Sequence, residues 1–242
     1  MDPFEDSKQM IGEMAVRAAN IPKRFASGFL GIDPQVTLEH IPLVARAKAW
    51  AALFNNRVCT GLYLSGQTGC GKSHLAAAIL HEVCMRGFGG RWVNLCELAH
   101  KFRCAFDGGW APTEDEVLEE FEGVALVVFD DLGAERPTPA FLEKLYLILK
   151  RRQDDMKPII VTSNYDGKTL RERLRGEHGE TADSGERIVA QLKGMVESLG
   201  TFPKIDLRRR PKTPVEAQQG PILPLSGAGV GNHTAQEETG HD

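Results

Sequence analysis

The sequence predicts an α/β fold in three layers, with a mostly parallel β-sheet covered by helices on both faces. Apolar, strand-like runs alternate with segments of helical periodicity along most of the chain, which is typical of such a sheet. Two of these runs, Ala125–Asp131 and Pro158–Asn164, are almost continuously apolar, as expected of strands buried on both faces. A third observation is that Gly61–Leu75 combines a strand, a glycine-rich loop and the start of a helix.

The glycine-rich loop fits the phosphate-binding pattern G-x-x-x-x-G-K-[ST]. In such a loop the backbone N–H groups and the N-terminus of the next helix surround phosphate oxygens. The lysine reaches the β- and γ-phosphates, and the hydroxyl ligates Mg²⁺. The alternative is a turn with an unrelated lysine, but the strand before it and the helical pattern Ser73–Met85 after it are the context that the motif requires. The candidate nucleotide-binding residues here are Gly66, Gln67, Thr68, Gly69, Cys70, Gly71, Lys72, Ser73 and His74, with Ser73 also a candidate metal ligand.

Two helices are expected before this loop, because Asp6–Ala19 and Pro42–Asn55 carry apolar residues at helical spacing. Pro22 separates them and disfavours a continuous helix. After the loop helix, the predicted elements are a strand at Arg91–Leu95 and helices at Glu97–Phe106 and Thr113–Phe121.

Beyond the strand Ala125–Asp131, Thr138 and Pro139 suit the N-cap and first turn of a helix. The elements predicted after Pro158–Asn164 are helices at Lys168–Arg175 and Gly185–Met195 and a last strand near Thr201–Leu207. The end of the chain is rich in Gly, Pro, Ser, Thr and Gln and cannot bury a core. We therefore expect a short N-terminal helix at residues 1–20, a folded domain at 21–210 and a disordered tail at 211–242.

Composition narrows the class of protein. The chain has 242 residues, 42% of them hydrophobic, which suits one sizeable domain with tails. Its net charge of −4 argues against a generally basic surface, so any nucleic-acid-binding surface must be local. The five cysteines are dispersed without a C-x-x-C pair, which indicates reduced thiols in a cytoplasmic protein and argues against a zinc site. Neither a signal peptide nor an apolar run long enough for a membrane span is evident, so no membrane partner is expected.

Three polar side chains stand where the two most apolar strands end: Asp130, Asp131 and Asn164. In an open α/β sheet the carboxyl ends of the strands form the edge that binds ligands. Asp130 is the candidate Mg²⁺ ligand, and Asp131 is the group that would orient or deprotonate the attacking water. Asn164 would hydrogen-bond the γ-phosphate or that water. The alternatives are acids that begin a turn at Leu132 and an asparagine that ends a strand.

Four stretches together resemble the DnaC/IstB-like AAA+ ATPases, which are helicase loaders and transposition helper proteins. They are the phosphate loop, VVFDDLG (Val127–Gly133), KPIIVTSN (Lys157–Asn164) and GERIVAQL (Gly185–Leu192), and IPKRF (Ile21–Phe25) is similar to the loader branch. The resemblance implies a P-loop AAA+ sandwich over residues 21–210 with a reduced C-terminal lid, and ATP and Mg²⁺ as cofactors. It assigns Walker A to Lys72 and Ser73, Walker B to Asp130 and Asp131, and sensor 1 to Asn164.

The arginines depart from the family pattern. In GERIVAQL the family commonly has R-x-x-x-R, whose second arginine is the finger that acts on a neighbouring subunit, and here that position is Gln191. Arg187 or Arg152 is the candidate substitute, and Arg208 stands where sensor 2 is expected. For each arginine the alternative is a solvated or ion-paired helix face.

The resemblance implies a role in DNA replication as a DnaC-like helicase loader that binds and hydrolyses ATP. Its implied partners are single-stranded DNA, a replicative helicase and further copies of itself in an ATP-dependent homo-oligomer. Lys101, Phe102 and Arg103, with Trp110 nearby, are the local candidates for DNA contact, because basic residues follow phosphates and rings stack on bases. The alternative is a helix whose Phe102 packs inward.

Two other functions stay open. One is an IstB-like transposition helper, which acts with a transposase and double-stranded DNA. The other is an ATP-dependent switch with negligible hydrolysis, which the glutamine at position 191 favours.

Overall fold

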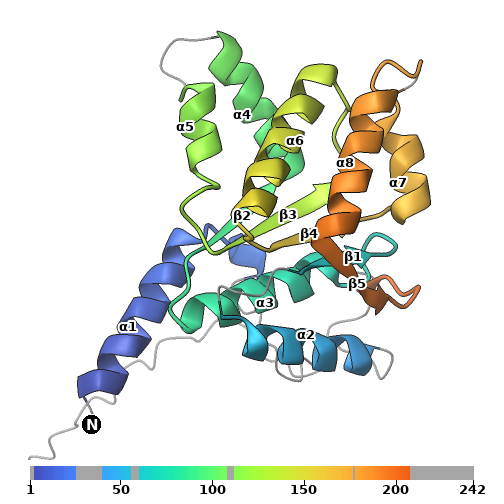
Figure 1. Cartoon of the computed structure of the whole chain (residues 1–242). Coiled ribbons are helices and arrows are strands. Elements are labelled where there is room, and N and C mark those ends of the chain that lie inside the picture. Colours follow the sequence, from blue (N-terminus) through green and yellow to red (C-terminus); the bar gives the residue numbers. More distant parts are fainter. Residues whose placement is uncertain (1–2, 26–39, 56–59, 108–111, 177, 208–242) are drawn as a thin grey trace, which may run out of the picture. The chain divides into compact units, whose positions relative to one another are not determined.

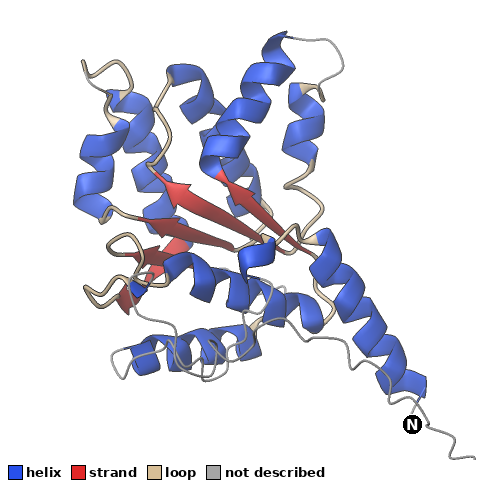
Figure 2. Ribbon diagram, turned by 180° about the vertical axis from the view of Figure 1, so that it is seen from behind, coloured by secondary structure: helices blue, strands red, loops and turns tan. Residues whose placement is uncertain are grey.

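The computed structural model describes residues 3–25, 40–55, 60–107, 112–176 and 178–207. Its strands form one parallel sheet in the order β2-β3-β4-β1-β5. They are β1 (Gly61–Ser65), β2 (Gly90–Asn94), β3 (Leu126–Leu132), β4 (Ile159–Ser163) and β5 (Val196–Thr201). Because the strands are parallel, their carboxyl ends meet along one edge, and Figure 2 shows the arrowheads pointing to the same side.

Helices cover both faces of the sheet (Figure 1). One layer holds α1 (Pro3–Ala18), α2 (Ile41–Leu53) and α3 (Lys72–Met85), with the short 3-10 turn η1 at Lys23–Phe25. The other layer holds α4 (Leu95–Asp107), α5 (Glu114–Glu119), α6 (Pro139–Asp154), α7 (Gly167–Leu174) and α8 (Ala182–Met195). The structure therefore confirms the predicted three-layer α/β fold with a parallel sheet.

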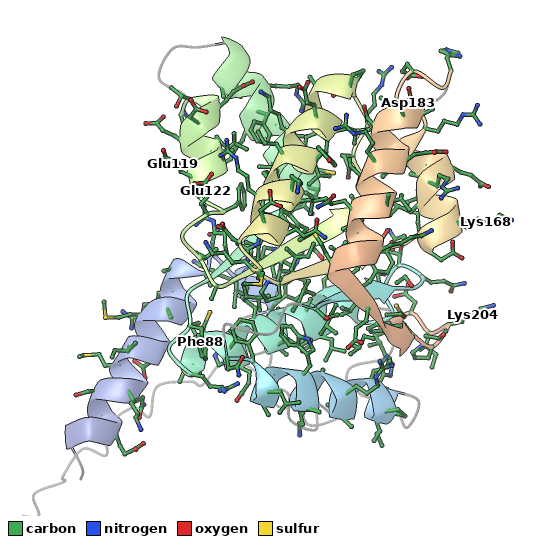
Figure 3. The ribbon with its side chains drawn as sticks, viewed as in Figure 1. Phe88, Glu119, Glu122, Lys168, Asp183 and Lys204 are labelled. Carbon is green, nitrogen blue, oxygen red and sulfur yellow. The ribbon has the colours of Figure 1, made fainter. Side chains whose placement is uncertain are left out.

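The core lies on both sides of the sheet. Every residue of β4 is buried, as are the four apolar residues that begin β3, which confirms that these two strands are buried on both faces. In the α1–α3 layer, Phe54 packs edge-on against Phe88, which Figure 3 labels near the end of α3, with ring centroids 5.1 Å apart. Burial of such rings holds the end of α2 against the segment that follows α3.

Most predicted elements are confirmed, with ends that differ by a few residues. The side chain of Thr138 accepts a hydrogen bond from the Phe141 N–H at the N-cap of α6, and Pro139 occupies the first turn, as expected. The last strand is the exception: it lies at Val196–Thr201, directly after α8, and not near Thr201–Leu207. It is an edge strand with exposed Glu197 and Ser198, so it lacks the apolar run by which an interior strand is recognised.

Several expectations fall outside the described residues. One concerns Trp110, which lies in the gap at residues 108–111. The others concern Arg208, the tail 211–242 and the reduced C-terminal lid, since the description ends at Leu207. The domain boundaries likewise stay predictions, although α1 packs on α3 and β2 within the first compact unit of the chain, Met1–Arg208. Among the described helices, none combines the length and apolar character that crossing a membrane requires.

Candidate nucleotide-binding and active site

The phosphate loop connects β1 to α3 and lies at the carboxyl edge of the sheet. Gly71 is the N-cap of α3 with φ 97°, a left-handed conformation that side chains rarely adopt, so glycine is required at this position. Two other segments hold the loop from outside. The Leu207 N–H donates to the Gly69 carbonyl at 2.9 Å, and buried His40 donates from Nε2 to the Cys70 carbonyl at 3.0 Å.

Lys72 joins the loop to the neighbouring strand. Its Nζ donates hydrogen bonds to the carbonyl oxygens of Gly66 and Gln67, both at 2.9 Å, and to Oδ1 of Asn164 at 3.0 Å. Asn164 follows β4, and its Oδ1 also accepts from the Thr68 hydroxyl at 3.4 Å. The side chains predicted for phosphate binding and for sensor 1 are thus in direct contact.

Asp130 is buried near the end of β3, and its two carboxylate oxygens differ in their hydrogen bonding. Its Oδ1 accepts hydrogen bonds from the hydroxyls of Ser73 and Thr162, each at 2.7 Å. Its Oδ2 is buried and has no hydrogen-bond partner among the described residues. An unpaired buried carboxylate oxygen is costly unless a cation or a donor satisfies it. Together with the hydroxyl of Ser73, this oxygen donor set fits Mg²⁺, which binds through one or two carboxylates and substrate phosphates.

Asp131 departs from regular strand geometry. The pairing of β3 with β4 shifts register between Phe129 and Leu132, so that Asp130 and Asp131 together stand opposite Thr162. Asp131 has φ 64°, the left-handed region that aspartate and asparagine tolerate better than most residues. This bulge, and not simple alternation along a strand, is what separates the two acids.

Asp131 is partly buried and lies near several charged groups. Burial raises the pKa of the Asp131 carboxyl above its usual value, and the charge of Asp130 raises it further. The positive charges of Lys72 and Arg24 act in the opposite direction. Arg24 belongs to η1, and the adjacent Phe25 ring packs edge-on against His74, with centroids 6.2 Å apart.

The structure contradicts the suggestion that Arg152 acts on a neighbouring subunit. The Arg152 side chain is only 1% exposed. Its guanidinium donates to four backbone carbonyl oxygens, those of Phe121, Val124, Ala125 and Pro158, at 2.6 to 3.1 Å. A guanidinium enclosed in this way is a structural tie between the chain segments that lead into β3 and β4.

The other candidates on α8 face α6. Arg187 is exposed, and its guanidinium carbon lies 4.3 Å from the centre of the Tyr146 ring. Gln191 donates from Nε2 to Oε1 of Gln153 at 2.5 Å. Both side chains therefore make contacts within their own chain, and the structure does not bring Arg187 to the phosphate loop.

The segment proposed for DNA contact packs inward in part. Phe102 is buried in the core, and Lys101 forms an ion pair with Glu120 at 2.6 Å. The alternative given for this segment, a helix whose Phe102 packs inward, is therefore confirmed, and DNA contact by its basic residues stays a prediction. Of this group, Arg103 alone is exposed among the described residues.

Sequence reasoning missed three residues that bear on the site: His40, Arg24 and Thr162. Thr162 carried a signal, since it is a polar residue that directly follows the three apolar residues of β4 and is buried with them. The other two come from segments far from the motif, and only the fold brings them to it.

Known proteins are similar to this chain in sequence and in fold. A family model described as "IstB-like ATP binding protein" matches residues 48–178, more than half of the chain. The chain is 27% identical to the replicative helicase loader DnaC of Buchnera aphidicola subsp. Acyrthosiphon pisum over 149 residues, which cover 61% of this chain and 55% of that protein. For DnaC of Escherichia coli strain K12, identity is 27% over 152 residues, covering 62% and 56%. The chain thus spans about half the length of the curated relatives it matches.

Solved structures agree on the fold. The crystal structure of DnaI is similar with a TM-score of 0.64 and 26% identity, covering 76% of this chain and 95% of that chain. AMPPCP-bound DnaA from Aquifex aeolicus has a TM-score of 0.57 at 18% identity, covering 74% and 51%. These similarities confirm the predicted P-loop AAA+ fold.

Proposed function

Because the chain belongs to the family of IstB-like ATP-binding proteins, a branch of the AAA+ ATPases, we propose that it binds Mg²⁺·ATP in the phosphate loop and hydrolyses it. The observation that carries this proposal is the linked set of side chains at the sheet edge. Lys72 bonds Asn164, and Ser73 bonds an Asp130 whose second oxygen is free to ligate a cation. Phosphoryl transfer needs positive charge placed at the phosphates, which Lys72 and a cation bound at Asp130 would supply.

Each residue has a defined part in the proposed chemistry. The loop N–H groups and Lys72 bind the phosphates and neutralise charge that develops in the transition state. Ser73 and Asp130 would hold Mg²⁺, which would supply positive charge to the phosphate oxygens. Asp131 orients the water and accepts its proton, and Asn164 bonds the γ-phosphate or that water.

We further propose that the protein acts in DNA replication as a cytoplasmic helicase loader. The curated relatives named above are replicative helicase loaders. The region that the family model matches, residues 48–178, holds every site residue predicted from the sequence except Arg187 and Arg208. The proposed partners are single-stranded DNA, a replicative helicase and further copies of this chain. An ATP-dependent homo-oligomer would allow a neighbour to supply an arginine to the site.

The switch hypothesis keeps one specific observation in its favour. Gln191 occupies the position of the family's trans-acting arginine and is bonded to Gln153. A protein that lacks this cation can still bind ATP tightly while hydrolysing it slowly.

Single-turnover ATP hydrolysis, measured with purified protein, tests these functions. The protein would be assayed alone, with single-stranded DNA, with duplex DNA and with the purified replicative helicase of its host. A loader should bind the helicase in an ATP-dependent manner and respond to single strands. A response to duplex DNA alone would favour the transposition helper. ATP binding without hydrolysis in any mixture would favour the switch, and absence of ATP binding would overturn the proposal.

A further inference from the structure

Thr162 is a buried hydroxyl in the middle of the sheet. It belongs to β4, between strands β3 and β1, and its residue is 0% exposed. Buried strands of parallel sheets are built mainly from apolar residues, and valine would fill nearly the same volume here. A hydroxyl in this place is tolerated only when it is fully hydrogen-bonded.

The hydroxyl meets this requirement through the two acids of β3. Thr162 Oγ1 donates its single proton to Oδ1 of Asp130 at 2.7 Å. The same oxygen accepts the backbone N–H of Asp131 at 3.0 Å. One side chain on β4 is therefore bonded to both acids at once.

The second of these bonds supports the bulge in β3. A bulge leaves one residue outside the regular ladder, so its N–H needs another partner. At Asp131, which also has the unfavourable φ of 64°, that partner is the Thr162 hydroxyl. Without it, this partly buried N–H would lose its partner and the left-handed conformation would be less well supported.

The first bond determines which carboxylate oxygen stays available. With Ser73, the Thr162 hydroxyl occupies Oδ1 of Asp130, and Oδ2 is the oxygen without a partner among the described residues. A carboxylate held at one oxygen by two donors cannot rotate freely, so its other oxygen keeps a fixed direction.

We propose that Thr162 is the positioning residue of this site: its hydroxyl orients Asp130 for the metal and fixes the bulge that presents Asp131. The inference rests on the proposed function, since it concerns the Mg²⁺·ATP that the site would bind. Thr162 contacts neither nucleotide nor water, and its effect passes through the two acids.

The test compares Thr162→Ala with Thr162→Ser, because serine restores the hydroxyl and alanine does not. Binding of a fluorescent ATP analogue is titrated with Mg²⁺, and single-turnover hydrolysis is measured in parallel. We expect alanine to leave metal-free nucleotide binding unchanged and to weaken the apparent affinity for Mg²⁺ about tenfold, the effect of one hydrogen bond to a charged group. Serine should restore Mg²⁺ affinity to within about threefold of the wild type.

Two controls keep the result interpretable. Ile160→Val removes one buried methylene from the same strand, so it reports the effect of mild destabilisation without a change at the acids. If Thr162→Ala fails to fold by circular dichroism, Thr162→Val takes its place, since valine keeps the β-branched shape.

Suppose that nucleotide binding by the wild type depends on Mg²⁺, and that the serine variant and the variant without the hydroxyl have equal Mg²⁺ affinities. This result would overturn the role of Thr162 and leave the proposed function intact. If nucleotide binding by the wild type does not depend on Mg²⁺, both the role of Thr162 and the proposed function are overturned. A loss in the hydroxyl-free variant that serine reverses and Ile160→Val does not reproduce supports the proposal.

Discussion

Lys72 of the phosphate loop and Asn164 beyond β4 are bonded directly, with Nζ and Oδ1 3.0 Å apart. The lysine is 5% exposed, and each of its three N–H donors has an acceptor within hydrogen-bond distance. A phosphate group that binds the lysine must therefore compete with these acceptors, and Asn164, which directly follows β4, is the one that lies outside the phosphate loop. The contact couples occupancy of the loop to the end of β4.

Replacing Lys72 with alanine should abolish or strongly weaken ATP binding while leaving the fold intact. The substitution removes a phosphate contact and no core residue, and we expect a loss of at least about tenfold in affinity, the effect of one charge-assisted hydrogen bond. Titration with a fluorescent ATP analogue measures the loss. Lys168→Ala, an exposed lysine on α7 (Figure 3), is the matched control and should bind as the wild type does. Wild-type affinity in Lys72→Ala would argue against the ATPase assignment.

Asp131→Asn should bind ATP and hydrolyse it about 10²–10⁴ times more slowly, the usual contribution of a general base. Asparagine keeps the shape of the side chain and tolerates the left-handed backbone at this position. Single-turnover hydrolysis at saturating ATP separates the chemical step from binding. A rate within twofold of the wild type would remove Asp131 from the chemistry.

The same substitution should stabilise the nucleotide-free protein at neutral pH. Burial and the charge of Asp130 raise the pKa of Asp131 in the folded state. The carboxyl therefore contributes favourably to the free energy of unfolding at pH values below its pKa in the unfolded chain. This contribution is lost as the pH rises through its pKa in the folded state. Removing the charge removes that loss, so the Tm of Asp131→Asn should lie above that of the wild type at neutral pH.

Thermal unfolding from pH 4 to pH 8 checks this expectation. The difference between Asp131→Asn and the wild type should grow as pH rises and nearly vanish at the acidic end. Asp131→Ala removes the same charge but tolerates φ 64° less well, so it should lie lower throughout and show the same slope with pH. A pH-independent difference would show that the charge of Asp131 costs no stability.

Arg152→Met should be strongly destabilising. It removes the donor from four buried backbone carbonyls, and an unsatisfied buried group costs about 1–3 kcal/mol. We expect a loss of about 3 kcal/mol or more, which lowers Tm by roughly 6–12 °C. Burial also lowers the pKa of Arg152 to about 10, the cost of holding this charge away from water.

Arg151→Met is the matched control, one residue away on α6. Arg151 is exposed and forms an ion pair with Glu122, which Figure 3 labels beside α5. Surface pairs of this kind contribute little, so the free energy of unfolding should change by less than about 1 kcal/mol. Similar melting temperatures for the two variants would contradict the structural role of Arg152.

The contrast between these two arginines shows where prediction from sequence ends. The alternating pattern, the phosphate loop and the two apolar strands are local in sequence, and they predicted the fold and the position of the edge that binds ligands. Whether Arg151 or Arg152 is buried depends on carbonyl groups from distant parts of the chain. The Phe121 carbonyl, for example, lies 31 residues before Arg152 in the sequence. The bulge at Asp131 has the same origin, since it depends on the hydroxyl of a neighbouring strand.

The last prediction concerns how the site is completed. Within the described residues, the cations that act on Asp131 are Lys72 and Arg24, and Arg187 lies against Tyr146 on α6 instead. An arginine supplied in trans is worth about 10³–10⁵ in rate in phosphoryl transfer. If Arg187 acts on a neighbouring subunit, turnover per subunit should rise with protein concentration and with single-stranded DNA. Arg187→Ala should erase this rise and spare ATP binding, and mixing it with Lys72→Ala protein should restore activity.

Gln191→Arg tests whether an arginine at position 191, where the family commonly has its trans-acting arginine, can act on a neighbouring subunit. The substitution replaces a side chain bonded to Gln153 by a cation, and Gln191→Ala breaks the same bond without adding charge. We expect Gln191→Arg to raise turnover at least tenfold over Gln191→Ala at high protein concentration, because a new positive charge would reach the neighbour's γ-phosphate. At concentrations where the protein is monomeric, the two variants should have equal turnover.

Turnover per subunit that does not change with protein concentration or DNA in any variant, including mixtures shown to co-assemble, would leave no role for an arginine in trans. Nucleotide binding alone would then set the protein's affinity for its partner.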